Sequence, residues 1–186
     1  VLPWLGAKGK FQIWSTKDDV QFMDAADEPV SKNAIAKHWP LFRPLFQHLL
    51  HANGRLLELL PDDLRDEELC TIAVKEDGGS LFCVPAALRT ERLCEAAATE
   101  NSIALRHTPK GLMTADFLFR VVSKNSKALQ DIPPEFLSTE MCMRAVENDG
   151  RLLQHVPIDW RTLPLCEAAV RQDGVALQHV PKCTLT

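Results

Sequence analysis

Residues 134–157 read PEFLSTEMCMRAVENDGRLLQHVP, and residues 158–181 read IDWRTLPLCEAAVRQDGVALQHVP. The two stretches are consecutive copies of one 24-residue unit that ends in proline. The same unit is found at 62–85, 86–109 and 110–133, and a more divergent copy is found at 38–61. We number the positions of each unit from 1 to 24, so that the closing proline is position 24. A fixed period of this kind is typical of stacked helical repeats.

The first half of the unit has the pattern of an amphipathic helix. Positions 8, 9, 12 and 13 are apolar in the five regular copies, and this spacing places them on one helical face. Position 12 is alanine in most copies, which would let a neighbouring helix approach closely. In the five regular copies, position 5 carries a side-chain oxygen that can cap a helix N-terminus: Asp66, Thr90, Thr114, Ser138 and Thr162. The pattern predicts a helix of about 11 residues that begins after position 5.

The second half of the unit predicts a turn and a short helix. Position 16 is Asn or Asp and position 17 is Gly or Ser, which is typical of a helix end where the chain turns through positive φ. Position 20 is leucine in all six copies, and we expect it to face the first helix. The sequence therefore predicts an all-α fold, an α-solenoid of about six helix-turn-short-helix repeats.

The repeats define the expected domain organisation. Residues 38–181 form the predicted repeat array, and residues 182–186 begin a further unit without completing it. Residues 1–37 do not fit the repeat, and we expect them to form an N-terminal segment that caps the exposed apolar face of the first unit.

Local signals within the N-terminal segment predict three elements. Residues 11–14 are expected to be extended. Ser15 and Thr16, followed by two aspartates, predict a helix that reaches about Ala26. Ser31 is expected to cap a second helix that runs towards His38.

Composition excludes several classes of protein. The 186 residues are 46% hydrophobic and carry a formal net charge of −4. An acidic total argues against nucleic-acid binding and against general adhesion to anionic membranes, which need a basic surface. The sequence contains no apolar run of the ~18 residues that a transmembrane helix requires. We therefore expect no nucleic-acid partner and no membrane-spanning segment.

The cysteines are predicted to be free and buried. Four of the six occupy position 9 of their units: Cys70, Cys94, Cys142 and Cys166. Equivalent positions of stacked helices lie about 10 Å apart, whereas a disulfide needs Cα atoms within about 7 Å. Small buried thiols that pack between helices are the simpler interpretation. Unpaired cysteines also favour a reducing cytosol as the place where the protein acts.

The repeated string resembles a bacterial domain family of unknown function. The string is T-x-x-L-C followed by A-V-x-x-D-G-x-x-L-Q-H-V-P, and it is clearest at 134–157 and 158–181. The resemblance covers about 38–181, although the copy at 38–61 departs from it, with Phe42 in place of the N-cap and prolines at 40 and 44. The family is built from tandem helical units punctuated by leucine and proline. The resemblance implies a virulence protein, a secreted bacterial effector that acts in a host cell, and it brings no catalytic residue.

Position 22 is one candidate binding surface. It varies more than the rest of the unit, and in the last four copies it is His107, Asp131, His155 and His179. These residues could form a ladder that contacts a partner, or they could be ordinary solvated surface. A metal is disfavoured, because zinc needs ligands at 2.0–2.1 Å and successive repeats are about 10 Å apart. His48 and His51 are also candidate metal ligands, but no further ligand completes a known spacing. We predict no metal and no cofactor.

Position 4 is the second candidate. Arg65, Arg89 and Arg161 recur there, so that a basic ridge is expected along the array. Such a ridge could bind an acidic protein, or the headgroup of a phosphoinositide. The alternative is that each arginine pairs with a nearby glutamate or with a helix C-terminus.

No catalytic signature is present in the sequence. It has no glycine-rich phosphate loop, no GxSxG elbow and no CxxC pair, and outside position 9 only Cys83 and Cys183 offer a thiol. We therefore expect a non-catalytic scaffold for protein–protein interaction, with another protein as its partner. One alternative is a membrane-targeting module that binds phosphoinositides through the basic ridge. Another is an enzyme whose site has no recognisable motif.

Overall fold

The computed structural model describes residues 12–15, 20–23 and 39–182. Near the N-terminus it contains a two-stranded antiparallel hairpin, in which β1 (Gln12–Ser15) pairs with β2 (Val20–Met23). The expected extended piece at 11–14 is thus confirmed for Gln12 to Trp14. The helix expected from Ser15 to Ala26 is wrong, since residues 20–23 read Val-Gln-Phe-Met, an alternation that suits a strand. The helix expected after Ser31 lies outside the described residues.

The rest of the described chain is all-α, as the sequence predicts. The α-helices from α3 onwards have ten residues each and begin at intervals of 24 residues, at positions 6 to 15 of the unit. α2 is longer, with 14 residues, and contains Pro44. The helices are α2 (Trp39–Ala52), α3 (Glu67–Glu76), α4 (Glu91–Glu100), α5 (Ala115–Lys124), α6 (Thr139–Asn148) and α7 (Leu163–Gln172).

The predicted short helix is a 3-10 helix of six residues at positions 17 to 22. Its copies are η1 (Gly54–Leu59), η3 (Gly78–Cys83), η5 (Ser102–His107), η7 (Ser126–Asp131), η9 (Gly150–His155) and η11 (Gly174–His179). A second 3-10 turn of three residues occupies positions 1 to 3, in the predicted connector. Its copies are η2 (Asp62–Leu64), η4 (Ala86–Leu88), η6 (Lys110–Leu112), η8 (Pro134–Phe136) and η10 (Ile158–Trp160).

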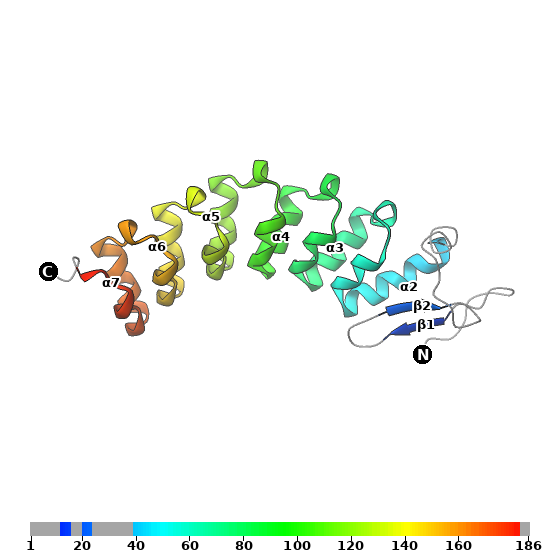
Figure 1. Ribbon diagram of the computed structural model, residues 1–186, viewed down its shortest axis with the longest axis horizontal. Coiled ribbons are helices and arrows are strands. Elements are labelled where there is room, and N and C mark those ends of the chain that lie inside the picture. The colour runs from blue at the N-terminus through cyan, green and yellow to red at the C-terminus, as the bar shows by residue number, and fades with distance from the viewer. Residues whose placement is uncertain (1–11, 16–19, 24–38, 183–186) are drawn as a thin grey trace. The chain divides into compact units, whose positions relative to one another are not determined.

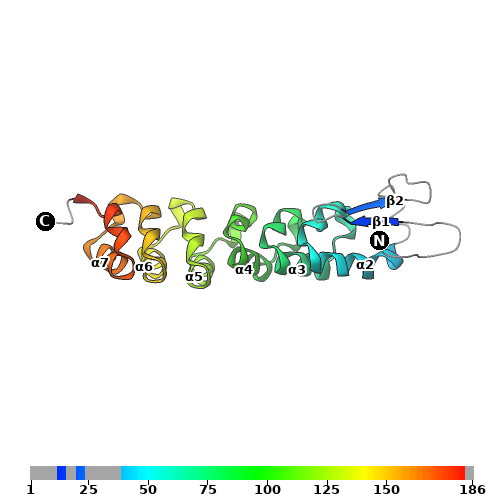
Figure 2. The same cartoon turned by 90° about the horizontal axis from the view of Figure 1, so that it is seen from below.

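The chain divides into two compact units, Val1–Leu88 and Arg89–Thr186. In the first unit α2 packs against α3, and η1 contacts both helices. In the second unit α4, α5, α6 and α7 pack in chain order, and their 3-10 helices form a second row of neighbours (Figures 1 and 2). Stacking in sequence order is therefore observed within each unit, and one continuous solenoid of six repeats stays a prediction.

Position 5 begins each regular helix as its sequence predicts. In four copies the side chain accepts a hydrogen bond from the backbone N–H of position 8, as Asp66 Oδ1 does from Leu69 at 2.9 Å. Thr162 has the same extended conformation but makes no side-chain cap, and Pro164 lies in the first turn that follows it.

Position 16 ends the α-helix in a different way from the one predicted. Asp77 has φ −146° and ψ 105°, an extended conformation, and the other copies are similar. Its backbone N–H donates to Ala73 O at 2.9 Å, and its Oδ1 accepts from Gly79 N at 2.8 Å. The residue therefore closes the α-helix and caps the 3-10 helix at once. Because a second helix starts immediately, the expected turn through positive φ is wrong.

Glycine at position 17 allows close packing in two of the copies, whereas Ser102 and Ser126 occupy this position in two others. A Cβ atom on Gly54 would lie 2.2 Å from Ala73 O, and one on Gly150 would lie 2.3 Å from Ala169 O. In both cases the obstacle is the backbone of the helix in the next repeat, which packs on the glycine. At Gly174 no atom lies within 4 Å of such a Cβ.

The core consists of the positions that the repeat marks as apolar. Residues at positions 8, 9, 12 and 13 are buried in α3 to α6, and alanine at position 12 is fully buried. Leucine at position 20 is also buried, at 1% exposure or less, in five copies: Leu57, Leu81, Leu105, Leu129 and Leu153. The sixth, Leu177, is 53% exposed.

Candidate functional site

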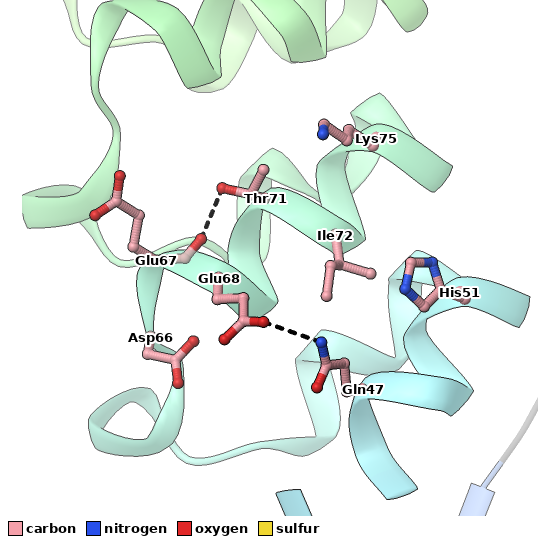
Figure 3. Close-up of a pocket in the computed structure, with 8 residues that line it drawn as sticks. All are labelled: Gln47, His51, Asp66, Glu67, Glu68, Thr71, Ile72 and Lys75. Atoms are coloured by element: carbon pink, nitrogen blue, oxygen red, sulfur yellow. Dashed lines mark hydrogen bonds between the residues drawn. The ribbon is translucent and has the colours of Figure 1, made fainter. Parts of the chain in front are cut away.

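A broad surface hollow lies between α2 and α3 in the first unit (Figure 3). Its volume is about 720 Å³, and it is open to solvent. α2 contributes Gln47 and His51, and the remaining side chains come from α3 and its N-cap: Asp66, Glu67, Glu68, Thr71, Ile72 and Lys75.

Polar contacts join the two helices that flank the hollow. Arg43 of α2 donates to Asp66 at 2.9 Å and to Glu68 at 2.5 Å. Gln47 donates to Glu68 at 3.0 Å (Figure 3). Further along, His51 Nδ1 lies 3.2 Å from a carboxylate oxygen of Glu76. These contacts hold α2 and α3 together beside the hollow. They also engage three nearby carboxylates, those of Asp66, Glu68 and Glu76.

Two charged side chains at the hollow have no ion pair among the described residues. Glu67 and Lys75 are both exposed, and the backbone carbonyl of Glu67 accepts from Thr71 Oγ1 at 2.7 Å. The two residues are eight apart on α3, which places them about 12 Å apart along the helix axis. The hollow thus offers one negative and one positive side chain on either side of Thr71 and Ile72 (Figure 3).

The corresponding surface of the second unit is occupied by its own ion pairs. Arg120 of α5 pairs with Glu91 and, at 2.9 Å, with Glu95 of α4. Lys124 also donates to Glu95, at 2.8 Å. The two cations lower the pKa of the Glu95 carboxyl. In this pair of helices, position 10 of α4 therefore binds positions 11 and 15 of α5.

The arginines at position 4 bind backbone carbonyls. Arg161 donates to Val156 O at 3.0 Å, to Gln154 O at 3.1 Å and to His179 O at 2.7 Å. Arg65 makes the equivalent bonds to Leu60, Glu58 and Cys83, and Arg89 donates to His107 O at 2.9 Å. Each guanidinium bonds the last carbonyl of the 3-10 helix in its own repeat, and Arg65 and Arg161 also bond the end of the preceding repeat. This geometry corresponds to the alternative in which the arginines pair with helix C-termini.

The residues at position 22 lie on successive 3-10 helices but differ in their surroundings. The Asp131 side chain is only 7% exposed, and it accepts from Ser102 Oγ at 2.6 Å and from Arg106 at 3.1 Å. His155 is exposed, whereas His107 and His179 are half-buried. Asp131 therefore serves the contact between η5 and η7 and is turned away from an external partner. Among residues 12–15, 20–23 and 39–182, no group of three or more His, Cys, Asp or Glu side chains could hold a metal ion.

The five cysteines within the described ranges are free and buried, which confirms the prediction for position 9. Burial raises the pKa of the Cys70, Cys83 and Cys142 thiols to about 11, and it also raises the pKa of Cys94. A nucleophilic cysteine needs the opposite shift and an exposed sulfur. Cys83 is therefore unsuited to catalysis, and Cys183 lies outside the described residues.

Thiol labelling tests this description of the cysteines. We expect the folded Cys183→Ser variant to react with Ellman's reagent about a hundredfold more slowly than an exposed thiol, because the thiolate is nearly absent at pH 8. In denaturant all five remaining thiols should react. One rapidly labelled cysteine in the folded protein would contradict the buried arrangement.

Glu67 and Lys75 were not among the binding residues predicted from the sequence. They occupy positions 6 and 14, where the copies share no chemistry: position 6 is Arg, Glu, Glu, Ala, Thr and Leu in chain order. A surface feature that belongs to one pair of helices leaves no mark on the repeat pattern, and no other signal in the sequence indicates it.

From α2 onwards the described chain is thus all-α and consists of tandem helix and 3-10 helix repeats. The family described as Domain of unknown function (DUF4116) matches residues 114–161. The match spans 48 of 186 residues, which is two periods of the repeat, from the N-cap Thr114 to Arg161. It agrees with the resemblance to a family of unknown function. Comparisons with curated proteins and with solved structures gave no match. In the described part of the chain, no helix has the length and apolar character needed to cross a membrane.

Proposed function

We propose that this chain is a non-catalytic module that binds another protein through the hollow between α2 and α3. The observation that carries the proposal is the pair of exposed charges, Glu67 and Lys75, which have no ion pair among the described residues and lie on either side of an open depression. A site for a small molecule usually encloses most of its ligand. An open depression with separated charges suits the surface of a protein, where charge complementarity sets the orientation of the partner.

The lipid-binding alternative has less support. A phosphoinositide site needs several cationic groups that are free to meet phosphate oxygens. The arginines at position 4 instead bond backbone carbonyls, and others pair with carboxylates, as Arg55 does with Asp77 at 2.8 Å and Arg151 with Asp173 at 2.7 Å. The enzyme alternative is weakened by the buried thiols with raised pKa values.

The chain resembles a bacterial family of unknown function whose units are often found in secreted effectors, and this resemblance suggests the proposed setting. A secreted bacterial effector would meet its partner in the cytosol of a host cell. The free, buried thiols support a reducing compartment of this kind.

The test is capture of partners from a host-type cell lysate. The chain is compared with Glu67→Lys and with the matched control Glu140→Lys, which changes an exposed carboxylate in the first turn of α6 instead of α3. A charge reversal at an interface places like charges together, so we expect Glu67→Lys to weaken the captured partner's binding about tenfold or more. Glu140→Lys should retain it.

Lipid vesicles provide the second arm of this test. Vesicles that contain phosphoinositides should bind the chain no better than neutral vesicles. If Glu67→Lys and Glu140→Lys captured the partner equally, the hollow would not be the binding site. Specific binding to phosphoinositide vesicles would favour the lipid-targeting alternative.

A further inference from the structure

The side of α7 that α6 does not cover is apolar and accessible. It forms a hollow of about 350 Å³ lined mainly by Leu163, Val170, Leu177 and Val180. Leu163 and Leu177 are each 53% exposed. We call this surface the α7 face.

Three of these four positions are buried one repeat earlier. Val146 and Leu153 have no exposure and Val156 has 1%, because α7 and η11 pack over that repeat. Their equivalents on the α7 face carry the same residue types, yet Val170 and Val180 are only partly covered and Leu177 is half exposed. The α7 face therefore has the residues and the arrangement of a surface that, one repeat earlier, receives a helical unit.

One polar residue of the α7 face, Glu167, also has a counterpart in a covered repeat, that of α4. Position 10 is Glu95 in α4, where it binds Arg120 at position 11 of the next helix. Position 10 of α7 is Glu167, which is exposed and has no ion pair among the residues the structure describes. An occupant that packed as α5 does on α4 would place its own position 11 beside Glu167.

We propose that the α7 face binds a further helical unit of the same 24-residue class, packed on α7 as α7 is packed on α6. The unit presents its apolar positions 8 and 12 to Val170 and Leu177, and a basic residue at position 11 to Glu167. This contact is separate from the α2–α3 hollow, so it does not depend on the function proposed above. The inference rests on continuity with the observed packing of α6 against α7.

The test extends the full chain by one completed unit. Residues 182–186 occupy positions 1 to 5, so a tail that copies residues 163–181, with arginine at position 11, completes the unit. We expect hydrogen exchange of the α7 and η11 amides to slow at least about tenfold relative to the same chain with a scrambled tail, because opening of that repeat must then also undock the tail.

Two substitutions show whether the α7 face is responsible. Leu177→Glu, on this face, should abolish the slowing. Ile103→Glu changes an apolar residue of similar exposure, 49%, on η5 and should preserve it. Exchange in α4 and α5 reports whether each variant is folded. Glutamate in place of arginine at position 11 of the tail should weaken docking about twofold to fivefold, as expected for an exposed ion pair.

Two outcomes would overturn the proposal. In the first, the ordered and scrambled tails protect α7 equally. In the second, the unextended chain sediments as a dimer that Leu177→Glu converts to a monomer, which would assign the face to a second copy of the chain.

Discussion

Gly150→Ala is expected to lower the free energy of unfolding by about 2–3 kcal/mol. A Cβ atom at this position would lie 2.3 Å from Ala169 O and 3.1 Å from Asp173 N. Both are backbone atoms of the next repeat, so no side-chain rotation relieves the clash and α7 must move away from η9. That movement also loosens the packing of Leu153, which is fully buried in this repeat.

Gly174→Ala is the matched control, since Gly174 occupies the same position of the last described unit. No atom lies within 4 Å of the new Cβ, so we expect a change of less than about 0.5 kcal/mol, or a small gain from the reduced freedom of the unfolded chain. Urea unfolding followed by circular dichroism measures both variants. If both variants were destabilised equally, the loss of stability would arise within the 3-10 helix and not from contact with the next repeat. If Gly150→Ala did not destabilise the protein, α7 would be able to move away from η9 without lowering the free energy of unfolding.

The α-helices could be predicted because their signals are local. An oxygen-bearing side chain at position 5 and an apolar face at 8, 9, 12 and 13 act within one helix, and the observed helices occupy positions 6 to 15. The inward direction of leucine at position 20 was also predictable from its invariance, but its full burial also needs the next repeat, since Leu153 is buried and Leu177 is 53% exposed.

The glycine shows where local reasoning fails. An Asp-Gly pair at a helix end usually indicates a left-handed residue, but Asp149 is extended here, with φ −146°. Its side chain caps η9 through Arg151 N at 3.1 Å, so the chain enters a second helix without reversing. The requirement for glycine comes from a helix 19 residues further on, at Ala169, and such a contact is not visible in the residues around the turn.

The sequence identifies which residues are candidates for binding, but it does not predict which atoms their side chains bond. The sequence places arginines in a row at position 4, and a row of like charges favours a ligand. Arg65 and Arg161 donate to backbone carbonyls, which every residue has and no sequence pattern marks, and Arg65 also pairs with the Asp62 carboxylate at 2.7 Å. In the same way, Asp131 belongs to a ladder of polar residues in sequence, yet its carboxylate is bonded by Ser102 and Arg106.

Arg161→Met is expected to lower the free energy of unfolding by about 2–3 kcal/mol. Methionine keeps much of the aliphatic volume but removes the donors to Val156, Gln154 and His179. The carbonyls of Val156 and His179 are partly buried, so they lose a charge-assisted bond without full access to water. Arg161→Lys should be intermediate, because one ammonium group cannot reach three acceptors with the geometry of a guanidinium.

Arg151→Met is the control, because it removes an arginine of the adjacent repeat that pairs with a carboxylate. Its side chain is 68% exposed and its bond to Asp173 measures 2.7 Å, so we expect a much smaller loss of stability than for Arg161→Met, which decreases further in high salt. Urea unfolding at low and high salt separates the two cases. A small, salt-sensitive loss at Arg161 would mean that its guanidinium faces solvent. The row at position 4 would then return as a candidate surface for an acidic partner.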